Sequence, residues 1–249
     1  MILSDRFQVR LSYDGTEFHG SQYQPELRTV QGELERGLIK IGWKGKSVLF
    51  AGRTDAGVHA AGQVIAFDLD WGHTEKELQK AINAVIPQDI SAVEVKRTKI
   101  DFHPRYQALS RVYQYQIINS PTRDPLQERY IWRVWPETDV NLMEQASRQL
   151  IGTHDFAALG KAHQPDGSTI RKISRAAWRK KGTKLVFELE GNAFLYHMVR
   201  HIVAVLVRIG QGIEPEDIII KYLDNPTGTE AQGLAPAQGL SLVEVKYQD

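Results

Sequence analysis

Apolar residues occupy alternate positions from Phe7 to Tyr13, with polar or basic residues between them. This period of two predicts a half-buried strand whose second face is polar and basic. Over residues 30–41 the apolar positions recur at helical spacing, which predicts a helix. Two short apolar runs, 47–51 and 64–69, predict strands on either side of a glycine-rich connection.

A second helix is expected after the sequence Thr74-Glu75-Lys76-Glu77. This is a capping box, because the hydroxyl of Thr74 and the carboxylate of Glu77 can satisfy orphan backbone amides reciprocally. Pro87 ends the helix, and residues 90–97 predict a further strand. The first hundred residues therefore follow the order strand, helix, strand, strand, helix, strand, which is the ferredoxin-like order.

The second half of the chain repeats this order. Its expected elements are a strand at 111–118, a helix at 141–151 capped by Asn141, a hairpin of 173–178 and 184–190, a helix from about Phe194 to Ile209, a short helix after Pro215 and a last strand at 241–247. We therefore expect an α+β protein with two ferredoxin-like or RRM-like β-α-β-β-α-β halves, 1–105 and 106–249. Their antiparallel sheets are expected to join around a central active-site cleft.

The helix expected at 194–209 is apolar over most of its circumference, so it is expected to be buried. The remaining sector carries the basic side chains of His197, Arg200, His201 and Arg208, with Ala204 among them. Such a stripe would line a cleft, or its members would satisfy carboxylates in the core. Burying an arginine for packing alone is costly, which favours a functional role for Arg200.

Composition narrows the possible classes of protein. The chain has 249 residues, of which 42% are hydrophobic, and this is enough for one large or two small domains. It has no cysteine, which excludes disulfides, thiolate metal sites and a thiol nucleophile. No long apolar run or signal-peptide pattern is present, so a soluble cytoplasmic protein without membrane contact is expected.

Charge is distributed unevenly along the chain. The formal net charge is +1, but residues 161–184 hold eight basic side chains against the single acid Asp166, a net of +7. This segment is either a face that binds phosphates or a solvated lysine-rich hairpin. Its candidate RNA-binding residues are Arg171, Lys172, Arg175, Arg179, Lys180, Lys181 and Lys184.

The segment Gly52–Ala60, GRTDAGVHA, lies between two predicted strands. Its glycines allow the backbone to turn tightly around Arg53 and Asp55. A carboxylate beside guanidinium groups stays ionised at neutral pH, which suits a nucleophile or a general base and not a general acid. An Arg–Asp pair that merely braces a loop is the alternative, and the rest of the segment decides between the two.

GRTDAGVHAAGQVIAFD at 52–68 resembles the signature of the tRNA pseudouridine synthase A family, and the resemblance extends over almost the whole chain. Five further segments match the family's motifs in the same order: 13–35, 111–115 (RVYQY), 154–156 (HDF), 194–212 (FLYHMVRHIVAVLVRIGQG) and 239–242 (GLSL). Three positions depart from it, since Ser21, His201 and Ala204 stand where tryptophan, asparagine and glycine are common.

The resemblance implies an isomerase that converts uridine to pseudouridine at tRNA positions 38, 39 and 40 in the anticodon stem-loop. It implies that Asp55 is the catalytic nucleophile, attacking either the uracil ring or C1′. Tyr113 is expected to stack on the base and to assist proton transfer, and Arg200 to orient Asp55. Arg53 is expected to act in base flipping. The resemblance also implies a homodimer that needs neither cofactor nor metal.

Several other side chains favour structural roles, and the sequence offers little for other functions. Tyr115 is expected in the core, and His59, His154 and Asp155 in loop bracing. A non-catalytic binder of structured RNA lacks support because no RNP1 pattern occurs. A glycosidic hydrolase would need a second carboxylate near Asp55. His197 and His201 resemble half a zinc site, but the carboxylate pattern of helical metalloproteases is missing.

Overall fold

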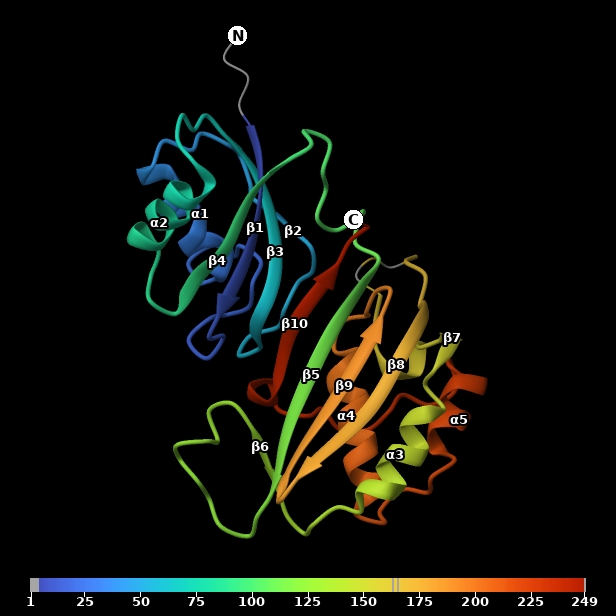
Figure 1. Ribbon diagram of the computed structural model, residues 1–249. Coiled ribbons are helices and arrows are strands. Elements are labelled where there is room, and N and C mark those ends of the chain that lie inside the picture. Colours follow the sequence, from blue (N-terminus) through green and yellow to red (C-terminus); the bar gives the residue numbers. More distant parts are fainter. Residues whose placement is uncertain (1–4, 163, 165, 249) are drawn as a thin grey trace. The chain divides into compact units, whose positions relative to one another are not determined.

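The computed structural model describes residues 5–162, 164 and 166–248, which form two compact units (Figure 1). Unit 1 comprises the described residues of Met1–Leu109 and Leu242–Asp249, and unit 2 those of Ser110–Ser241. The expected division lay between residues 105 and 106. In the structure unit 1 extends to Leu109, and the end of the chain returns to it.

Unit 1 consists of two helices and a set of strands, most of them long, that pair mainly antiparallel. Its elements are β1 (Asp5–Tyr13), α1 (Val30–Lys40), β2 (Leu49–Phe50), β3 (His59–Leu69), α2 (Glu75–Val85), β4 (Ile90–Thr98) and most of β10 (Leu240–Lys246). The strands follow the order β4-β1-β3-β10, and β2 pairs with β3. β1 pairs antiparallel with both β3 and β4.

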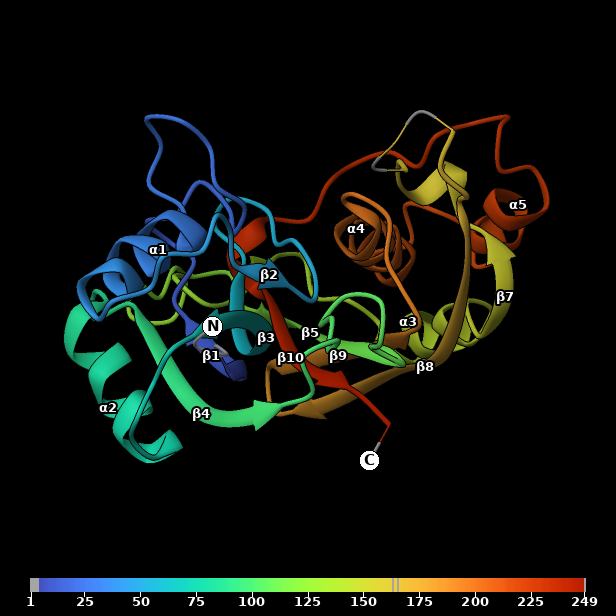
Figure 2. The same ribbon diagram turned by 90° about the horizontal axis from the view of Figure 1, so that it is seen from above.

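The alternation in β1 builds the core of unit 1. Phe7, Val9 and Leu11 are fully buried, and α1 and α2 cover this face of the sheet (Figure 2). Burying each such side chain contributes about 1.5–3 kcal/mol to folding. α2 begins as the sequence predicts, because Thr74 and Glu77 form its capping box. Thr29 caps α1 through its side chain, which accepts from the amide of Gly32.

Unit 2 contributes further strands, most of which pair antiparallel, and three helices. Its elements are β5 (Ser110–Asn119), β6 (Trp132–Val134), α3 (Val140–Arg148), β7 (Gly152–Asp155), β8 (Ile170–Lys181), β9 (Lys184–Gly191), α4 (Met198–Gly210) and α5 (Ile218–Asp224), with 3-10 turns at Ala157–Leu159 and Ala237–Gly239. The strand order is β5-β9-β8-β7, and β6 pairs parallel with β5. The expected hairpin about residue 182 is confirmed as β8 and β9.

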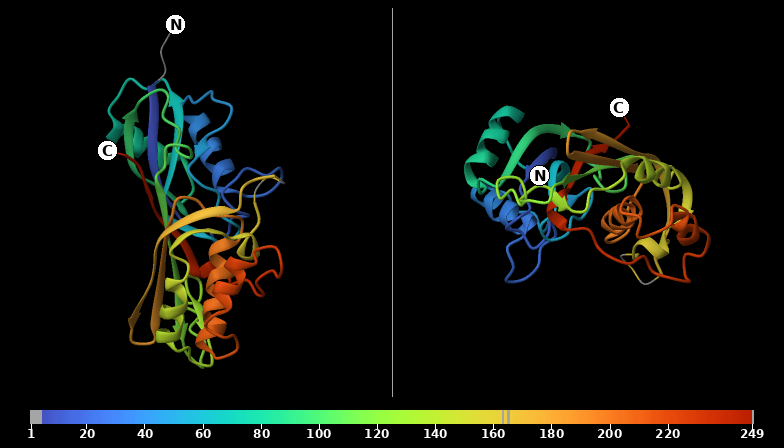
Figure 3. Two further views of the ribbon diagram at one scale, coloured as in Figure 1. Left: turned by 90° about the vertical axis from the view of Figure 1, so that its right-hand side faces the viewer. Right: turned by 90° about the horizontal axis from the view of Figure 1, so that it is seen from below.

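Helices α3, α4 and α5 lie together on one side of the unit 2 sheet (Figure 3). The expectation that the helix near residue 200 is buried is confirmed, because Met198, Ile202 and Leu206 have no exposed surface. α4 and α3 pack against each other, and α3 also contacts β8. This side of the sheet is therefore the apolar one.

Several sequence predictions were wrong at element boundaries. α4 begins at Met198 and not near Phe194, because Tyr196 forms a bridge with Lys161 and His197 has a left-handed φ of 63°. α3 is capped by Asp139 and not by Asn141, since the Asp139 carboxylate accepts from the amides of Asn141 and Leu142.

The protein has a mixed α/β fold in which most strands pair antiparallel, with five α-helices among the described residues. Unit 2 also contains β6 and β7, which the expected repeat lacks. That both halves follow one ferredoxin-like order therefore remains a prediction. None of the helices in the described part of the chain is long and apolar enough to cross a membrane.

Candidate active site

The loop between β2 and β3 carries Asp55. Exposure alternates along it: Arg53 is exposed, Thr54 is buried with 6% of its surface accessible, and Asp55 is half-buried. The Thr54 side chain faces the interior, while its two neighbours carry the groups expected to act on a substrate. The buried Thr54 can therefore fix the loop and leave both predicted site residues, Arg53 and Asp55, accessible.

Thr54 is held at all three of its polar groups. Its amide donates to Ser21 Oγ at 2.8 Å, and its carbonyl accepts from the Ser21 amide at 3.0 Å. Its Oγ1 lies 2.8 Å from the hydroxyl of Tyr13. Burial raises the pKa of Tyr13, and the hydrogen bonds to Thr54 and Gln63 offset part of that rise. The phenol is therefore protonated at neutral pH.

A tight turn follows Asp55. The amide of Val58 donates to the carbonyl of Asp55 at 3.1 Å, and Gly57 has a φ of 77°. A positive φ at the third position is what a type II turn requires, and glycine adopts it without steric cost. At the start of the loop, Gln63 Nε2 donates to the carbonyl of Gly52 at 2.9 Å.

His59 braces the end of this loop, as expected. Its Nδ1 accepts from the amide of Gly15 at 2.9 Å and lies 3.2 Å from the carboxylate of Asp14. Gly15 has to be glycine here, because a Cβ would lie 2.0 Å from the carbonyl oxygen of Val58. The segment from Asp14 to Ser21 thus runs against the Asp55 loop along its length.

Tyr113 and Tyr115 lie on β5 in unit 2, two residues apart on the same face. The Tyr113 ring meets Phe194 edge-on with centroids 5.0 Å apart, and 8% of Tyr113 is exposed. Tyr115 is fully buried and donates to the carbonyl of Pro236 at 2.6 Å. The packing role predicted for Tyr115 is confirmed, and burial raises the pKa of its hydroxyl well above the usual range.

Arg200 lies in the first turn of α4. Its Nε donates to the carbonyl of Ala235 at 2.7 Å, and the amide of Ala235 donates back to the carbonyl of Arg200 at 3.2 Å. His201 Nδ1 lies 2.8 Å from the carbonyl of Gly233. The predicted basic stripe therefore holds a strap of the same unit, residues 233–235.

The other members of the stripe have local partners. Arg208 pairs with Glu214 at 2.7 Å, and the His197 ring stacks on Tyr196 with centroids 3.7 Å apart. His197 is the N-cap residue of α4, and its ring lies edge-on to that of His201 with centroids 6.1 Å apart. Among the residues that the structure describes, no group of three histidine or acidic side chains is placed to hold a metal ion.

Two other predicted bracing residues also have local partners. His154 Nε2 lies 3.1 Å from the carbonyl of Ile151, and the Asp155 carboxylate accepts from the amide of Ala157 at 3.0 Å. Both contacts order the chain around β7, as the sequence predicts.

The basic hairpin β8–β9 also carries a carboxylate that pairs with two of its arginines. Glu188 on β9 accepts from Arg175 and from Arg179 at 2.7 Å each, and from Gln114 at 3.0 Å. Burial alone would raise the pKa of Glu188, but the hydrogen bonds from Gln114 and Arg175 and the charges of Arg179 and Arg175 lower it overall. Two of the candidate RNA-binding arginines thus already have a carboxylate partner.

The remaining basic residues of the segment differ in their surroundings. Lys180 pairs with Glu137 at 3.4 Å, and Arg171 donates to the carbonyls of Ser168 and Ile170. Lys172, Lys181 and Lys184 are exposed and have no ion-pair partner within the described residues.

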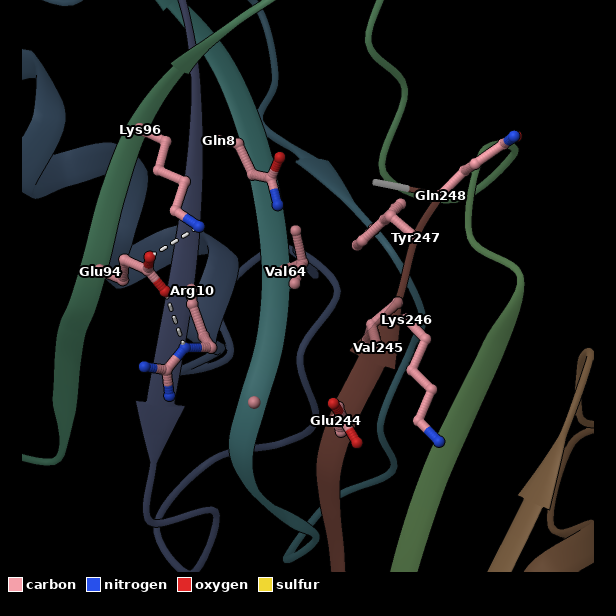
Figure 4. Close-up of a pocket in the computed structure, with 11 residues that line it drawn as sticks. Gln8, Arg10, Val64, Glu94, Lys96, Glu244, Val245, Lys246, Tyr247 and Gln248 are labelled. Atoms are coloured by element: carbon pink, nitrogen blue, oxygen red, sulfur yellow. Dashed lines mark hydrogen bonds and ion pairs between the residues drawn. The ribbon is translucent and has the colours of Figure 1, made fainter. Parts of the chain in front are cut away.

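A pocket lies on the polar face of the unit 1 sheet (Figure 4). Gln8 and Arg10 alternate along β1 with the buried core residues, so they point to the face away from α1 and α2. Glu94 lies between Lys96, at 2.8 Å, and Arg10, at 3.4 Å. Glu94 thus pairs with both cations, and the trio keeps a net charge of +1.

Comparison with known proteins assigns the family. Residues 11–107 and 146–248 match the family described as tRNA pseudouridine synthase. Asp55 and Arg200 lie in the matched regions, whereas Tyr113 lies between them. The chain belongs to this family of isomerases.

Three relatives agree with this assignment at nearly full length. The tRNA pseudouridine synthase A of Fervidobacterium nodosum is 42% identical over 97% of this chain and 99% of its own. That of Halalkalibacterium halodurans is 39% identical over 94% of this chain and 90% of its own. That of Listeria innocua is 40% identical over 98% and 99%.

The sequence motif contains Arg53 and Asp55, but the residues that hold their loop lie partly outside it. Tyr13 was expected only as a core position of β1, Ser21 only as a departure from the family, and Gln63 was not singled out. A polar residue in an apolar strand is the signal that could have identified Gln63, because a fully buried amide needs hydrogen-bond partners.

Proposed function

We propose that this chain converts uridine to pseudouridine at positions 38, 39 and 40 in the anticodon stem-loop of tRNA, with Asp55 as the nucleophile. The reaction breaks the N1–C1′ bond, turns the uracil and joins C5 to C1′. The C5 proton is lost and N1 gains one, so the mass does not change. No electron or group is taken from outside, and the reaction calls for no cofactor.

The placement of Asp55 carries this proposal. In a member of the pseudouridine synthase family, the aspartate of the GRTD segment is half-buried beside a threonine held at three points. A nucleophile gains most when its approach is fixed in advance, because the cost of orienting it is then met on folding. Asp55 attacks the uracil ring or C1′, and both routes use the same fixed carboxylate.

Tyr113 and Arg200 complete the proposed chemistry from unit 2. The Tyr113 ring stacks on the target base, and its phenol assists removal of the C5 proton after the base is rejoined. Arg200 orients Asp55 and favours its ionised form through a charge-assisted hydrogen bond. Its Nε is already used by Ala235, so this role falls to the terminal nitrogens of the guanidinium.

Arg53 acts in base flipping. A uridine stacked in a stem hides its reacting atoms, so it has to leave the stack before the reaction. Arg53 is exposed next to the buried Thr54, and its long side chain can fill the space that the extruded nucleotide leaves. Its position two residues before Asp55 couples flipping to the attack.

The basic hairpin supplies contacts to tRNA phosphates. The residues predicted from the sequence are Arg171, Lys172, Arg175, Arg179, Lys180, Lys181 and Lys184. Of these, Lys180 is left out of the proposed contacts, because it pairs with Glu137 and shares the face of β8 that carries Trp178. The unpaired Lys172, Lys181 and Lys184 are available directly, whereas a phosphate has to compete with Glu188 for Arg175 and Arg179.

The proposal also includes the assembly and location that accompany this activity. Two ferredoxin-like halves form a central cleft that holds the reacting uridine, and the protein acts as a homodimer on one tRNA. It works in the cytoplasm, where tRNA is modified. These statements follow from the family and from the sequence pattern of the two halves.

One assay tests the proposed function. The protein is incubated with an unmodified tRNA transcript, and the nucleosides are then analysed by mass spectrometry with and without a label specific for pseudouridine. Pseudouridine at positions 38, 39 or 40 with no change in mass is the expected result. Free uracil would identify a hydrolase, and unchanged RNA bound to the protein would identify a binding protein.

A further inference from the structure

The backbone of Asp55 is fixed on both of its sides. The carbonyl of Thr54, in the peptide before Asp55, accepts from the amide of Ser21 at 3.0 Å. The carbonyl of Asp55, in the peptide after it, accepts from the amide of Val58 at 3.1 Å. With both peptide planes held, the carboxylate retains only its own side-chain rotations.

Ser21 contributes a second contact one peptide earlier. Its Oγ accepts from the amide of Thr54 at 2.8 Å, so it fixes the peptide that joins Arg53 to Thr54. Ser21 is 1% exposed, which leaves no water to replace this acceptor. One serine therefore holds both peptide planes that flank Thr54.

Ser21 is itself anchored to a rigid element. Its carbonyl accepts from the amide of Gln31 at 3.0 Å, and the carbonyl of Gly20 accepts from Val30 at 3.3 Å. These two amides belong to the first turn of α1, where they have no partner within the helix. Gly20, with a φ of 90°, lets the chain pass so closely that a Cβ would lie 3.0 Å from the Thr54 carbonyl oxygen.

We infer that Ser21 is a positioning residue for the reaction, and this inference rests on the proposed function of Asp55. Ser21 transmits the position of α1 to the catalytic carboxylate through Thr54, and the Tyr13 hydroxyl secures the third group of Thr54. It touches neither RNA nor the reacting atoms in this role. Its loss should therefore affect turnover and not tRNA binding.

Ser21→Ala is the variant that tests this, since it removes the acceptor of the Thr54 amide and keeps the backbone contact. At saturating tRNA, turnover is expected to fall roughly ten- to hundred-fold, the range that small misplacements of a reacting group produce. KM and the Kd for tRNA should stay within about two-fold of wild type, because phosphate contacts dominate binding. Ser21→Thr keeps the hydroxyl and should recover most of the turnover.

Ser147→Ala is the matched control. Ser147 is also fully buried, and its hydroxyl donates to the carbonyl of Glu144 at 2.9 Å, so the substitution removes one buried hydroxyl elsewhere. Both alanine variants should lose a few degrees of Tm. Only Ser21→Ala should lose turnover, and equal losses in the two variants would overturn the inference.

Other outcomes decide the matter further. A folded Ser21→Ala protein with wild-type turnover, or with weakened tRNA binding and unchanged turnover, contradicts the inference. If Ser21→Ala does not fold, Tyr13→Phe removes the third contact to Thr54 and must lower turnover in its place. An Asp55→Asn protein assayed in parallel separates the two proposals: if it is active the proposed function fails, and if it is inactive beside a fully active Ser21→Ala, only Ser21 loses its role.

Discussion

The basic hairpin should contact tRNA with one face only. Side chains alternate along β8, so Arg179 and Lys181 point to one face and Lys180 to the other. Lys180 shares its face with Trp178, which stacks on Phe187, and pairs with Glu137. The face with Arg179 and Lys181 lies away from the helices, so we expect it to meet the phosphates.

The expected magnitude follows from counterion release. Each phosphate contact contributes about one unit to the slope of log affinity against log salt. Replacing Arg179 and Lys181 together by Gln should therefore flatten the slope by about one to two units. The lower value applies if Glu188 competes with phosphate for Arg179. At low salt, two surface contacts of about 1 kcal/mol each weaken binding roughly ten- to thirty-fold.

Fluorescence anisotropy with a labelled tRNA transcript, measured over a salt series, tests this prediction. Lys180→Gln is the control, because it removes one positive charge from the opposite face of the same strand and should leave the slope nearly unchanged. Turnover at saturating tRNA should be close to wild type in all variants. If the double variant kept wild-type affinity and slope, the hairpin would not belong to the binding surface. If only Lys180→Gln lost affinity, the opposite face of β8 would be the one that contacts tRNA.

Three further predictions concern chemistry, metals and stability. Tyr113→Phe should bind tRNA as well as wild type, because the ring still stacks, yet turn over far more slowly; a fully active variant would leave the phenol without a chemical role. Activity should persist in excess EDTA after dialysis, with magnesium controlled for the folding of tRNA itself, and restoration by zinc of a lost activity would contradict this. Glu188→Gln should lower the Tm at pH 7. Because the pKa of Glu188 is lowered in the folded state, its ionised form stabilises the fold at pH values above the usual glutamate pKa, and this effect is lost as the pH falls through the folded pKa. The difference in Tm between the two proteins should therefore disappear on acidification. A difference that persists in acid would show that packing and not charge is responsible.

Local sequence patterns predicted most elements because the relevant forces are local. The alternation from Phe7 to Tyr13 and the capping box at Thr74 fixed the positions of β1 and α2. The start of α4 was missed because Tyr196 pairs with Lys161, which is distant in sequence. No pattern of period 3.6 reports such a bridge.

The residues of the candidate site also differ in whether a local sequence pattern reveals them. Asp55 and Arg53 were found because their motif is contiguous. The contacts of Thr54 with Ser21 and Tyr13 join segments more than thirty residues apart, and single-sequence periodicity does not report pairs of that kind. The pairing of Arg175 and Arg179 with Glu188 was likewise missed, since a count of charges along the chain does not reveal a carboxylate on the adjacent strand.

The most direct test of the account is the amount of pseudouridine that Asp55→Asn forms in a tRNA transcript under single-turnover conditions. The substitution keeps the size of the side chain and removes its nucleophilic carboxylate, while the many phosphate contacts persist. The account predicts a folded protein that binds tRNA with nearly wild-type affinity and forms no measurable pseudouridine. An Asp55→Asn protein that retained even about a tenth of the wild-type rate would contradict the assignment of Asp55 as the nucleophile, because removal of such a group lowers rates by far more than ten-fold.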